Sequence, residues 1–595
     1  MSKKKQKLEL TWIGKEKRPR LEPRILVEDK SLSYSAEPSK TEITQELFED
    51  QGSEQPKPLN DNILIHGDNL LALKALEHKY AGKVKCIYID PPFNTGGAFQ
   101  HYDDGLEHSI WLSLMSQRLE AIKVLLSNDG AIVVNLDDSE MAYCKIIMDE
   151  VFGRQNYVTT IVVQAATGSS FKTVNTGPVD VTQYLLFYAK EKKLFNYKQQ
   201  YTLKNKVDLQ HFSRFITNPE DSCKEWLFRS INDYILETLG YKEGSIQAKW
   251  IKIKKDFGDF APLLVEQRAN EFAIDNAHLV FETKTLQKPS PYLNKLILKS
   301  KTLDYPIHVP RDNHEDLYLL KGRQIYFLSK SVGEIDGSKG AILPITTIWN
   351  DIPTNNLPKE GGVSFPSGKK PEALLRRLID MTSDEGDIIL DSFGGSGTTA
   401  AVAHKMKRRW ITVELGDQCE THILPRLKRV IDGTDQDGIS KVVDWQGGGG
   451  LHYYRMADSL LKKDAWNNWV INPEYNAEML SEAMCKHMGY IYEPSQDIFW
   501  QHGHSTENNY IYITTGTLSN EQLKLISSEV GSEGSLLICC KGFIAKTNEF
   551  DNLSLKKIPQ AILHKCEWDH DDYSFHINVL PDDEEEESKV EIDVD

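Results

Sequence analysis

Two short segments, far apart in the chain, carry residue types that suit one active site. Residues 90–96 read Asp-Pro-Pro-Phe-Asn-Thr-Gly, and residues 391–399 read Asp-Ser-Phe-Gly-Gly-Ser-Gly-Thr-Thr. In the first segment, a carboxylate and a backbone carbonyl can accept the two N–H bonds of an exocyclic amino group, and an aromatic ring can stack on a base that has swung out of a duplex. The amino nitrogen is a poor nucleophile because its lone pair is delocalised into the ring, and this grip would pull it toward tetrahedral geometry. We therefore expect direct methyl transfer to an amino nitrogen, with Asp90, Pro91, Pro92 and Phe93 as catalytic residues and Asn94 in contact with the substrate.

The second segment predicts a glycine turn between a strand and a helix, which suits a nucleoside cofactor. Glycine lets the backbone approach a ligand closely, and the N–H groups at a helix start favour an anionic group. An acidic residue, Glu414, ends the next strand, where such residues bind ribose hydroxyls in Rossmann-like sheets. The loop lacks Gly-Lys-Ser/Thr and a complete G-x-G-x-x-G, so S-adenosylmethionine fits better than ATP or a dinucleotide. The cofactor-binding residues expected here, with Asp391 meeting the cationic amino group, are Asp391, Phe393, Gly395, Gly397, Thr398 and Glu414.

Composition narrows the chemistry further. Methylation at cytosine C5 would need a cysteine nucleophile, usually in a Pro-Cys pair, and no Pro-Cys occurs. The eight cysteines are scattered, which indicates free thiols in a reducing cytoplasm. The histidines are isolated, and direct transfer needs no metal, so no metal site is expected. No segment approaches the ~18 consecutive apolar residues of a membrane helix, so no membrane association is expected.

Strands of apolar residues alternate with amphipathic helices in two separate blocks, which predicts an α/β fold with a parallel, doubly wound sheet. A chain of 595 residues is also too long for one core. We expect a Rossmann-like sheet built from two sequence blocks, with an inserted recognition domain and a separate mixed α/β C-terminal domain. The expected regions are an N-terminal arm (1–58), a first methyltransferase core block with the catalytic motif (59–165), the inserted target recognition domain (166–345), a second core block with the cofactor motif (346–432), a C-terminal partner or dimerisation domain (433–580) and an acidic disordered tail (581–595).

The inserted region contains a basic segment that could contact nucleic acid, although the chain has a net charge of −17. At strand spacing, residues 248–255 place Trp250, Lys252 and Lys254 on one face. A basic face with a tryptophan suits a phosphate backbone and an unstacked base. A solvated edge strand, whose lysines discourage aggregation, is an equally open interpretation.

The motifs resemble those of a known family. Residues 90–93 match the D-P-P-Y/F motif of amino-methyltransferases, and residues 391–399 match their D-x-F-x-G-S-G-T-T motif. The order of the motifs resembles the β class of DNA N6-adenine methyltransferases. Residues 67–69 resemble the N-terminal G-D motif of that class, which implies that Asp68 lies near the cofactor adenine. Residues 365–371 resemble the segment before the cofactor loop, which implies that Lys370 lies near the methionine end.

The long chain, its inserted region and its C-terminal domain resemble the modification subunit of type III restriction–modification systems. The resemblance implies S-adenosylmethionine-dependent methylation of adenine N6 in double-stranded DNA by base flipping, a homodimer, and a helicase–nuclease restriction subunit as partner. Two alternatives stay open. One is cytosine-N4 methylation, whose enzymes more often have serine at the position of Asp90. The other is a non-catalytic DNA-recognition subunit on a methyltransferase scaffold.

Overall fold

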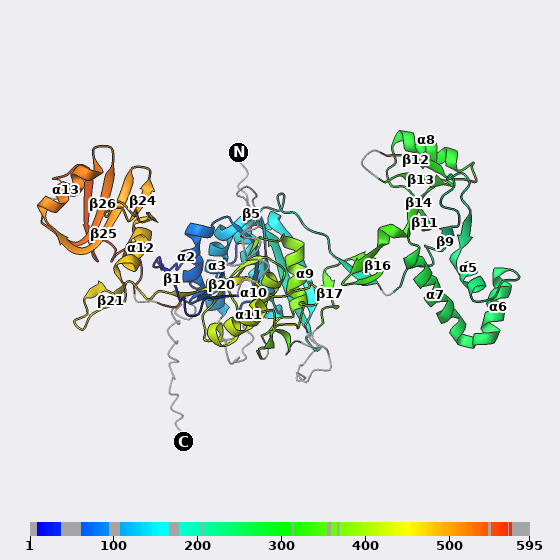
Figure 1. Cartoon of the computed structure of the whole chain (residues 1–595), viewed down its shortest axis with the longest axis horizontal. Helices are drawn as coiled ribbons and strands as arrows, with labels where there is room; N and C mark the ends of the chain where they lie inside the picture. The colour runs from blue at the N-terminus through cyan, green and yellow to red at the C-terminus, as the bar shows by residue number, and fades with distance from the viewer. Residues whose placement is uncertain are drawn as a thin grey trace, which may run out of the picture. The chain divides into compact units, whose positions relative to one another are not determined.

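The computed structural model describes residues 9–36, 61–93, 108–165, 178–204, 206–311, 315–353, 357, 359–365, 368–544, 549–568 and 571–573. Two compact units are present, Met1–Lys198 with Thr347–Asp595, and Gln199–Thr346. The second unit is the green part of the chain in Figure 1. Asn94 and the acidic tail 581–595 lie outside the described residues.

The first unit is organised around an 11-stranded sheet. Five neighbouring strands in its centre run parallel, in the order β3-β19-β18-β4-β5. Strands of the second sequence block thus lie between strands of the first, which confirms a sheet built from two blocks. The bounds of these strands are β3 (Asn62–His66), β4 (Val84–Ile89), β5 (Leu126–Leu136), β18 (Ile388–Asp391) and β19 (Arg409–Glu414).

Both edges of this sheet use segments that the sequence analysis assigned to other regions of the chain. On one side, β7 (Thr182–Ala189) pairs antiparallel with β5, although residues 166–345 were assigned to the inserted domain. This strand also pairs antiparallel with β6 (Tyr157–Gln164), so the alternation of parallel strands and helices that marked the core did not reveal it. On the other side, β20 (Gly450–Met456), from the region assigned to the C-terminal domain, pairs parallel with β3. The remaining strands of the sheet are β1 (Leu26–Glu28), β2 (Tyr34–Ser35) and β17 (Ile348–Trp349).

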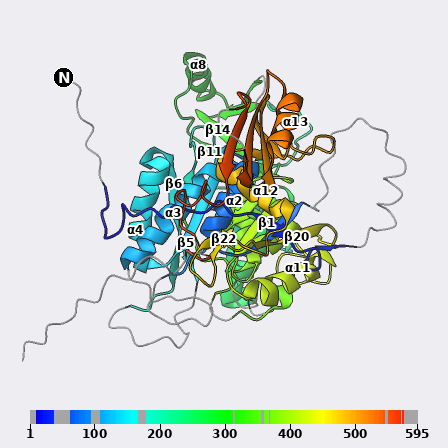
Figure 2. The same ribbon diagram turned by 90° about the vertical axis from the view of Figure 1, so that its left-hand side faces the viewer.

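Helices cover both faces of the sheet, so the central strands are buried on both sides as parallel strands usually are. Leu71, Trp111 and Met148 of the first helical group share one core with residues of β3, β4 and β5. That group comprises α2 (Asn69–Tyr80), α3 (His108–Leu125) and α4 (Asp138–Met148), and α3 and α4 lie side by side in Figure 2. In the second block, α9 (Glu372–Thr382) contacts β4, and α10 (Thr398–Lys405) contacts β18 and β19. Helix α11 (Leu424–Ile431) packs on α10. Among the described residues, no helix has both the length and the apolar character needed to cross a membrane.

The second unit has its own sheets and core. A 6-stranded sheet has the order β10-β9-β11-β14-β13-β12, and a 3-stranded sheet has the order β15-β16-β8. Its strands are β8 (Tyr201–Lys204), β9 (Arg214–Ile216), β10 (Phe228–Ser230), β11 (Val280–Lys284), β12 (Ile307–Val309), β13 (Leu317–Leu320), β14 (Arg323–Phe327), β15 (Val332–Ile335) and β16 (Ser338–Pro344). Its helices are α5 (Ile231–Thr238), α6 (Ile246–Phe257), α7 (Ala261–Asp275) and α8 (Pro291–Ser300).

The C-terminal region forms a 5-stranded sheet of order β23-β24-β25-β26-β27, some strands of which are drawn in orange in Figure 1. The apolar runs at 510–514 and 535–539 in the sequence predict two strands, and both lie within β25 and β26. The elements of this region are β21 (Leu461–Lys463), β22 (Trp469–Ile471), α12 (Ala477–Met488), β23 (Ile491–Tyr492), β24 (Gly503–Thr506), β25 (Asn509–Leu518), α13 (Asn520–Val530), β26 (Ser535–Phe543) and β27 (Leu553–Lys557).

The described residues of the N-terminal arm fasten this region to the core. Trp12 Nε1 donates a hydrogen bond of 2.7 Å to Ser113 Oγ on α3. Farther along, the Arg24 guanidinium is buried, donates to the Ala457 carbonyl at 2.7 Å, and pairs with Asp571 at 2.9 Å. The described part of the arm therefore docks onto the body of the protein.

Candidate active site

The two motifs meet at one edge of the central sheet. Strands β4 and β18 are parallel neighbours, with Ile87 opposite Leu390, so Asp90 and Asp391 lie at the same carboxyl-terminal edge. Ligands bind at this edge in open α/β sheets. The close approach predicted for the aspartate-diproline loop and the distant glycine turn is thus present.

Asp90 is held by one residue on either side. Asn135 Nδ2 donates to Asp90 Oδ1 at 2.9 Å, and the Lys370 ammonium lies 2.7 Å from Asp90 Oδ2. The same ammonium is 4.9 Å from the centroid of the Phe93 ring. The Lys370 and Asp90 side chains keep 12% and 17% of their surface exposed, so both remain within reach of a ligand. Sequence reasoning missed Asn135, although a polar residue in the otherwise apolar run 131–136 at the end of β5 was a usable signal.

The diproline loop is anchored from behind. Trp111, which is fully buried on α3, donates its indole N–H to the Pro92 carbonyl at 2.8 Å. The proline rings restrict the backbone further because each fixes its φ angle. Phe93 is partly buried and packs against the hydrophobic core that β3, β4 and β5 share with α2, α3 and α4. The Asp90 carboxylate and the Phe93 ring are therefore presented on a rigid turn.

The glycine turn approaches the neighbouring strand so closely that side chains are excluded. A Cβ atom on Gly394 would lie 2.7 Å from the Thr412 methyl group and 3.1 Å from the Val413 carbonyl oxygen. Gly395 and Gly397 have φ angles of +52° and +73°, which L-residues with side chains rarely adopt. Gly397 is the N-cap of α10. The turn therefore leaves a backbone cradle at the start of a helix.

Asp391 lies at the base of this cradle. Its Oδ2 accepts a hydrogen bond of 2.5 Å from Thr399 Oγ1, and its Oδ1 accepts one of 3.0 Å from the Phe393 N–H. Burial raises the pKa of the Asp391 carboxyl to about 8, and the charges of Asp90 and Glu414 act in the same direction. The two hydrogen bonds lower the pKa but do not offset the burial. A cationic amino group in the cradle would favour the ionised form, which fits the amino-acid end of S-adenosylmethionine.

The Glu414 carboxylate fastens the cradle to β19. Its Oε2 accepts from the Gly395 N–H at 2.7 Å. Its Oε1 accepts from Gln418 Nε2 at 2.7 Å and from the N–H groups of Leu415 and Gly416 at 2.9 and 3.1 Å. This arrangement gives Glu414 a clear structural role, and its contact with the cofactor ribose stays a prediction.

The Gly67-Asp68-Asn69 motif touches the glycine turn through a different residue from the one expected. Asn69 Nδ2 donates to the Ser392 carbonyl at 2.8 Å. Asp68 is fully buried, caps α2, and pairs with Arg118 at 3.1 Å. Its Oδ2 also accepts from the Tyr573 N–H at 3.2 Å. The side chain of Asp68 thus stabilises the packing of α2 and α3, and its expected proximity to the adenine ring stays a prediction.

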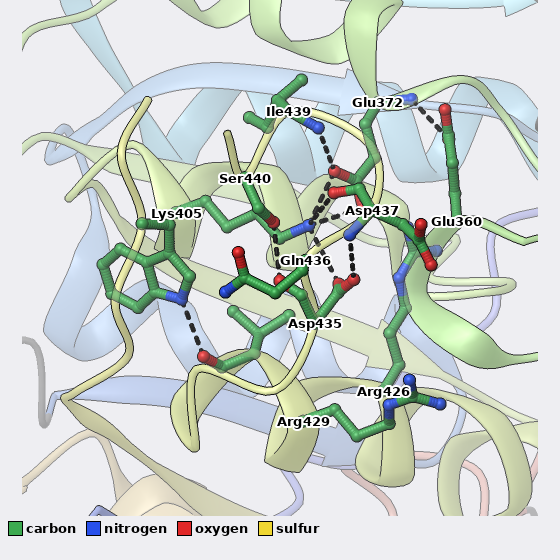
Figure 3. A network of polar contacts seen from close by, with 12 residues as sticks. Glu360, Glu372, Lys405, Arg426, Arg429, Asp435, Gln436, Asp437, Ile439 and Ser440 are labelled. Atoms are coloured by element: carbon green, nitrogen blue, oxygen red, sulfur yellow. Dashed lines mark hydrogen bonds and ion pairs between the residues drawn. The ribbon is translucent and has the colours of Figure 1, made fainter. Parts of the chain in front are cut away.

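A buried ionic network, drawn in Figure 3, also holds the glycine turn in place. Arg426 donates to the Ser396 carbonyl at 3.1 Å and to Thr398 Oγ1 at 2.7 Å, and it pairs with Glu372 at 2.8 Å. Lys405 pairs with the same Glu372 at 2.8 Å, and all three charged side chains are fully buried. The network therefore ties the glycine turn to α9, α10 and α11. Sequence reasoning missed it, and it engages the hydroxyl of Thr398, whose cofactor contact stays a prediction.

Residues 84–424 match the family model described as DNA methylase. The chain belongs to the DNA methylase family. It is 38% identical over 417 residues to the "Probable type III restriction-modification enzyme HindVI Mod subunit" of Haemophilus influenzae, an alignment that covers 67% of this chain and 54% of that protein. It is 27% identical over 379 residues to the type III restriction-modification enzyme StyLTI Mod subunit of Salmonella typhimurium, covering 57% and 49%. It is 27% identical over 415 residues to the type III restriction-modification enzyme EcoPI Mod subunit of Escherichia phage P1, covering 62% and 58%.

The chain thus spans about half the length of these relatives. The match to the DNA methylase family runs from β4 into α11 and includes both motifs and the second unit. Family membership supports S-adenosylmethionine as the cofactor that the geometry of the cradle favours.

Helix α6 of the second unit corrects one structural expectation. Residues 248–255 belong to helix α6 and not to a strand. Lys249 is buried and pairs with two carboxylates, and Trp250 packs partly against the core of the unit. Lys252 and Lys254 are exposed. Because successive helical residues are rotated by ~100°, Trp250 and Lys252 do not share a face, and the DNA contacts of Trp250, Lys252 and Lys254 stay predictions.

The described histidines and the cysteines are dispersed over the fold. Among the described residues, no three histidine, cysteine, aspartate or glutamate side chains are grouped so that they could hold a metal ion. All eight cysteines are free, as the sequence predicts.

Proposed function

We propose that this chain is a site-specific DNA methyltransferase that transfers a methyl group from S-adenosylmethionine to the N6 amino group of adenine in double-stranded DNA. The observation that carries the proposal is the position of Asp90 and Asp391 at the adjoining ends of two parallel strands. One carboxylate is partly exposed and lies near an aromatic ring, and the other is buried at the base of a glycine cradle. This is a site for an amino-bearing base next to a site for a cationic nucleoside.

The residues of the chain would act by positioning and electrostatics. Asp90 would accept a hydrogen bond from the adenine amino group and draw the nitrogen toward tetrahedral geometry. Phe93 would stack on the extruded base, and Trp111 would keep the loop rigid through its bond to the Pro92 carbonyl. Asp391 would balance the charge of the amino-acid end of the cofactor. When bound, S-adenosylmethionine supplies the electrophilic methyl group.

The experiment is expression of the chain in cells without adenine methylation, followed by digestion of their DNA and mass spectrometry of the nucleosides. We expect N6-methyladenine, and Asp90→Ala should abolish it while the protein still binds DNA. If the product is N4-methylcytosine, the methylated base is cytosine and the adenine assignment is wrong. If no methylated base is found and the protein does not bind the cofactor, the non-catalytic recognition subunit is the better assignment.

We further propose that the chain acts as the modification subunit of a type III-like restriction or phage-defence system. Support comes from its similarity to three Mod subunits and from a compact second unit, residues 199–346, inserted between the two motifs. That unit would recognise the target sequence, with Lys252 and Lys254 as candidate DNA contacts. A homodimer and a helicase–nuclease restriction subunit are the proposed partners. Replacing residues 199–346 by the equivalent unit of a relative should change the methylated sequence, and analytical ultracentrifugation with and without the restriction subunit tests the assembly.

A further inference from the structure

A lysine ammonium lies where the proposed function would place the target amino group. Lys370 Nζ is 2.7 Å from Asp90 Oδ2, which is hydrogen-bond distance for an N–H donor. It also lies 4.9 Å from the centroid of the Phe93 ring, within the range of a cation–π contact. One side chain thus uses both groups that would hold an extruded adenine.

The backbone that carries Lys370 is fixed, so only its side chain is free to leave. The neighbouring Lys369 is buried and donates to the carbonyls of Glu360 and Val363, the latter at 2.9 Å. On the other side, the Glu372 N–H donates to the Glu360 carboxylate at 3.0 Å and begins α9. A lysine side chain has four flexible carbon atoms and a strongly hydrated head group, so it can swing into solvent while its Cα stays in place.

We propose that Lys370 is a gate, occupying the base site of the free protein as a substitute for the target amino group and being displaced when adenine enters. This inference rests on the proposed function. The ion pair keeps Asp90 partnered while no substrate is bound, and breaking it opposes base extrusion. An ion pair of this limited exposure should lower the affinity for an extruded base roughly threefold to tenfold.

The gate predicts that removing Lys370 strengthens DNA binding, whereas the loss of a positive charge alone would weaken it. Removing a lysine from a DNA-binding surface ordinarily weakens binding, because fewer counterions are released from the phosphates. Removing Lys370 should instead favour the extruded state, because Asp90 and Phe93 become available without breaking an ion pair.

The test uses the full chain without cofactor and a duplex that keeps adenine at the methylated position identified by sequencing and carries 2-aminopurine immediately beside it. The fluorescence of 2-aminopurine rises when the neighbouring adenine leaves the stack. Lys370→Met should bind this duplex roughly threefold to tenfold more tightly than the native protein and give a stronger fluorescence signal. Lys370→Arg, which keeps the charge, should behave as the native protein does. The matched control Lys441→Met, at an exposed lysine, should give no gain. Equal or weaker binding and fluorescence for Lys370→Met would overturn the gate.

A second measurement is made on the free protein and does not depend on DNA methylation. The rate at which an amine-acetylating reagent modifies Lys370 in the free protein, followed by mass spectrometry of its peptide, reports the ion pair directly. Asp90→Asn should raise this rate several-fold and leave Lys441 unchanged, whereas equal rates at Lys370 would show that no pair holds it. Absence of any methylated base contradicts the proposed function and the gate together. Methylation with an unchanged Lys370→Met variant contradicts the gate alone.

Discussion

Asp391 should release a proton when the cofactor binds. Burial raises the pKa of its carboxyl to about 8, so the free protein carries a neutral carboxylic acid there at neutral pH. A bound ammonium group would favour the carboxylate because opposite charges at short distance lower the pKa of an acid. Binding at pH 6–7, where the ligand ammonium is already protonated, therefore has to expel the proton of Asp391.

The magnitude follows from the raised pKa. With a pKa of about 8, Asp391 is about nine-tenths protonated at pH 7 and almost fully protonated at pH 6. Cofactor binding should thus release about one proton per site, and the affinity should rise roughly tenfold from pH 6 to pH 7. The same shift affects stability. The folded chain binds this proton up to a higher pH than the unfolded chain does, so the free energy of unfolding falls as pH rises from about 4 to about 8.

Isothermal titration calorimetry with S-adenosylmethionine, in two buffers of different ionisation enthalpy, counts the released protons. Asp391→Asn should reduce the count to about zero and remove the pH dependence of the affinity, which will also be weaker overall. Asp497→Asn, at an exposed aspartate, is the control and should behave as the native chain does. A native count near zero at pH 6.5, or an unchanged count in Asp391→Asn, would refute the assignment of Asp391 to the cationic end of the cofactor.

Three further variants test other regions of the structure. Gly394→Ala places a Cβ atom 2.7 Å from the Thr412 methyl group. It should therefore lower the free energy of unfolding by about 1–3 kcal/mol in urea and weaken cofactor binding. Native values for both measurements would contradict the close approach of the glycine turn to β19. Arg426→Met leaves the buried Glu372 carboxylate without its guanidinium partner, so it should lower the free energy of unfolding by about 3–5 kcal/mol in the same assay. A loss below about 1 kcal/mol would show that the ionic network contributes little to stability. Alanine at the exposed Lys252 or Lys254 should leave the melting temperature unchanged and reduce the salt dependence of DNA binding by about one unit of slope for each phosphate that the side chain neutralises, and an unchanged slope would exclude that interaction.

The sequence predicted the central sheet and the edge at which its motifs meet, because short-range patterns define both. Apolar strands ending at Asp90 and Asp391 are local features, and the rule that ligands bind at the carboxyl ends of parallel strands then brings them together. The approach of Lys370 to Asp90 is a long-range side-chain contact that no periodicity encodes. The burial of Arg426 could not be predicted either, because the position of an arginine in an amphipathic helix does not show that its side chain is buried in an ion pair.

Helix α6 shows how an ambiguous pattern was misinterpreted. Lysines alternating with isoleucines satisfied a strand period over a few residues, but Lys249 and Ile253 are also four positions apart and share a buried helical face. Two boundary signals were present in the sequence. Ser245 caps the first turn through its side chain, and Gly258 follows the last residue of the helix. Start and stop residues were better evidence here than the short alternation between them.

The pairing of β4 with β18 has a consequence for how the chain reaches its folded state. These neighbouring strands are separated in sequence by the whole second unit, so β4 emerges from the ribosome long before the strand that covers its edge. The second unit, whose contacts lie within one continuous stretch, can fold in the meantime. In a nascent chain that has reached only that point, the edge of the apolar strand β4 that later pairs with β18 has no partner, and such an edge is a template for association with other chains. Stalled or truncated synthesis beyond the insertion should therefore yield aggregates that enclose a correctly folded middle unit.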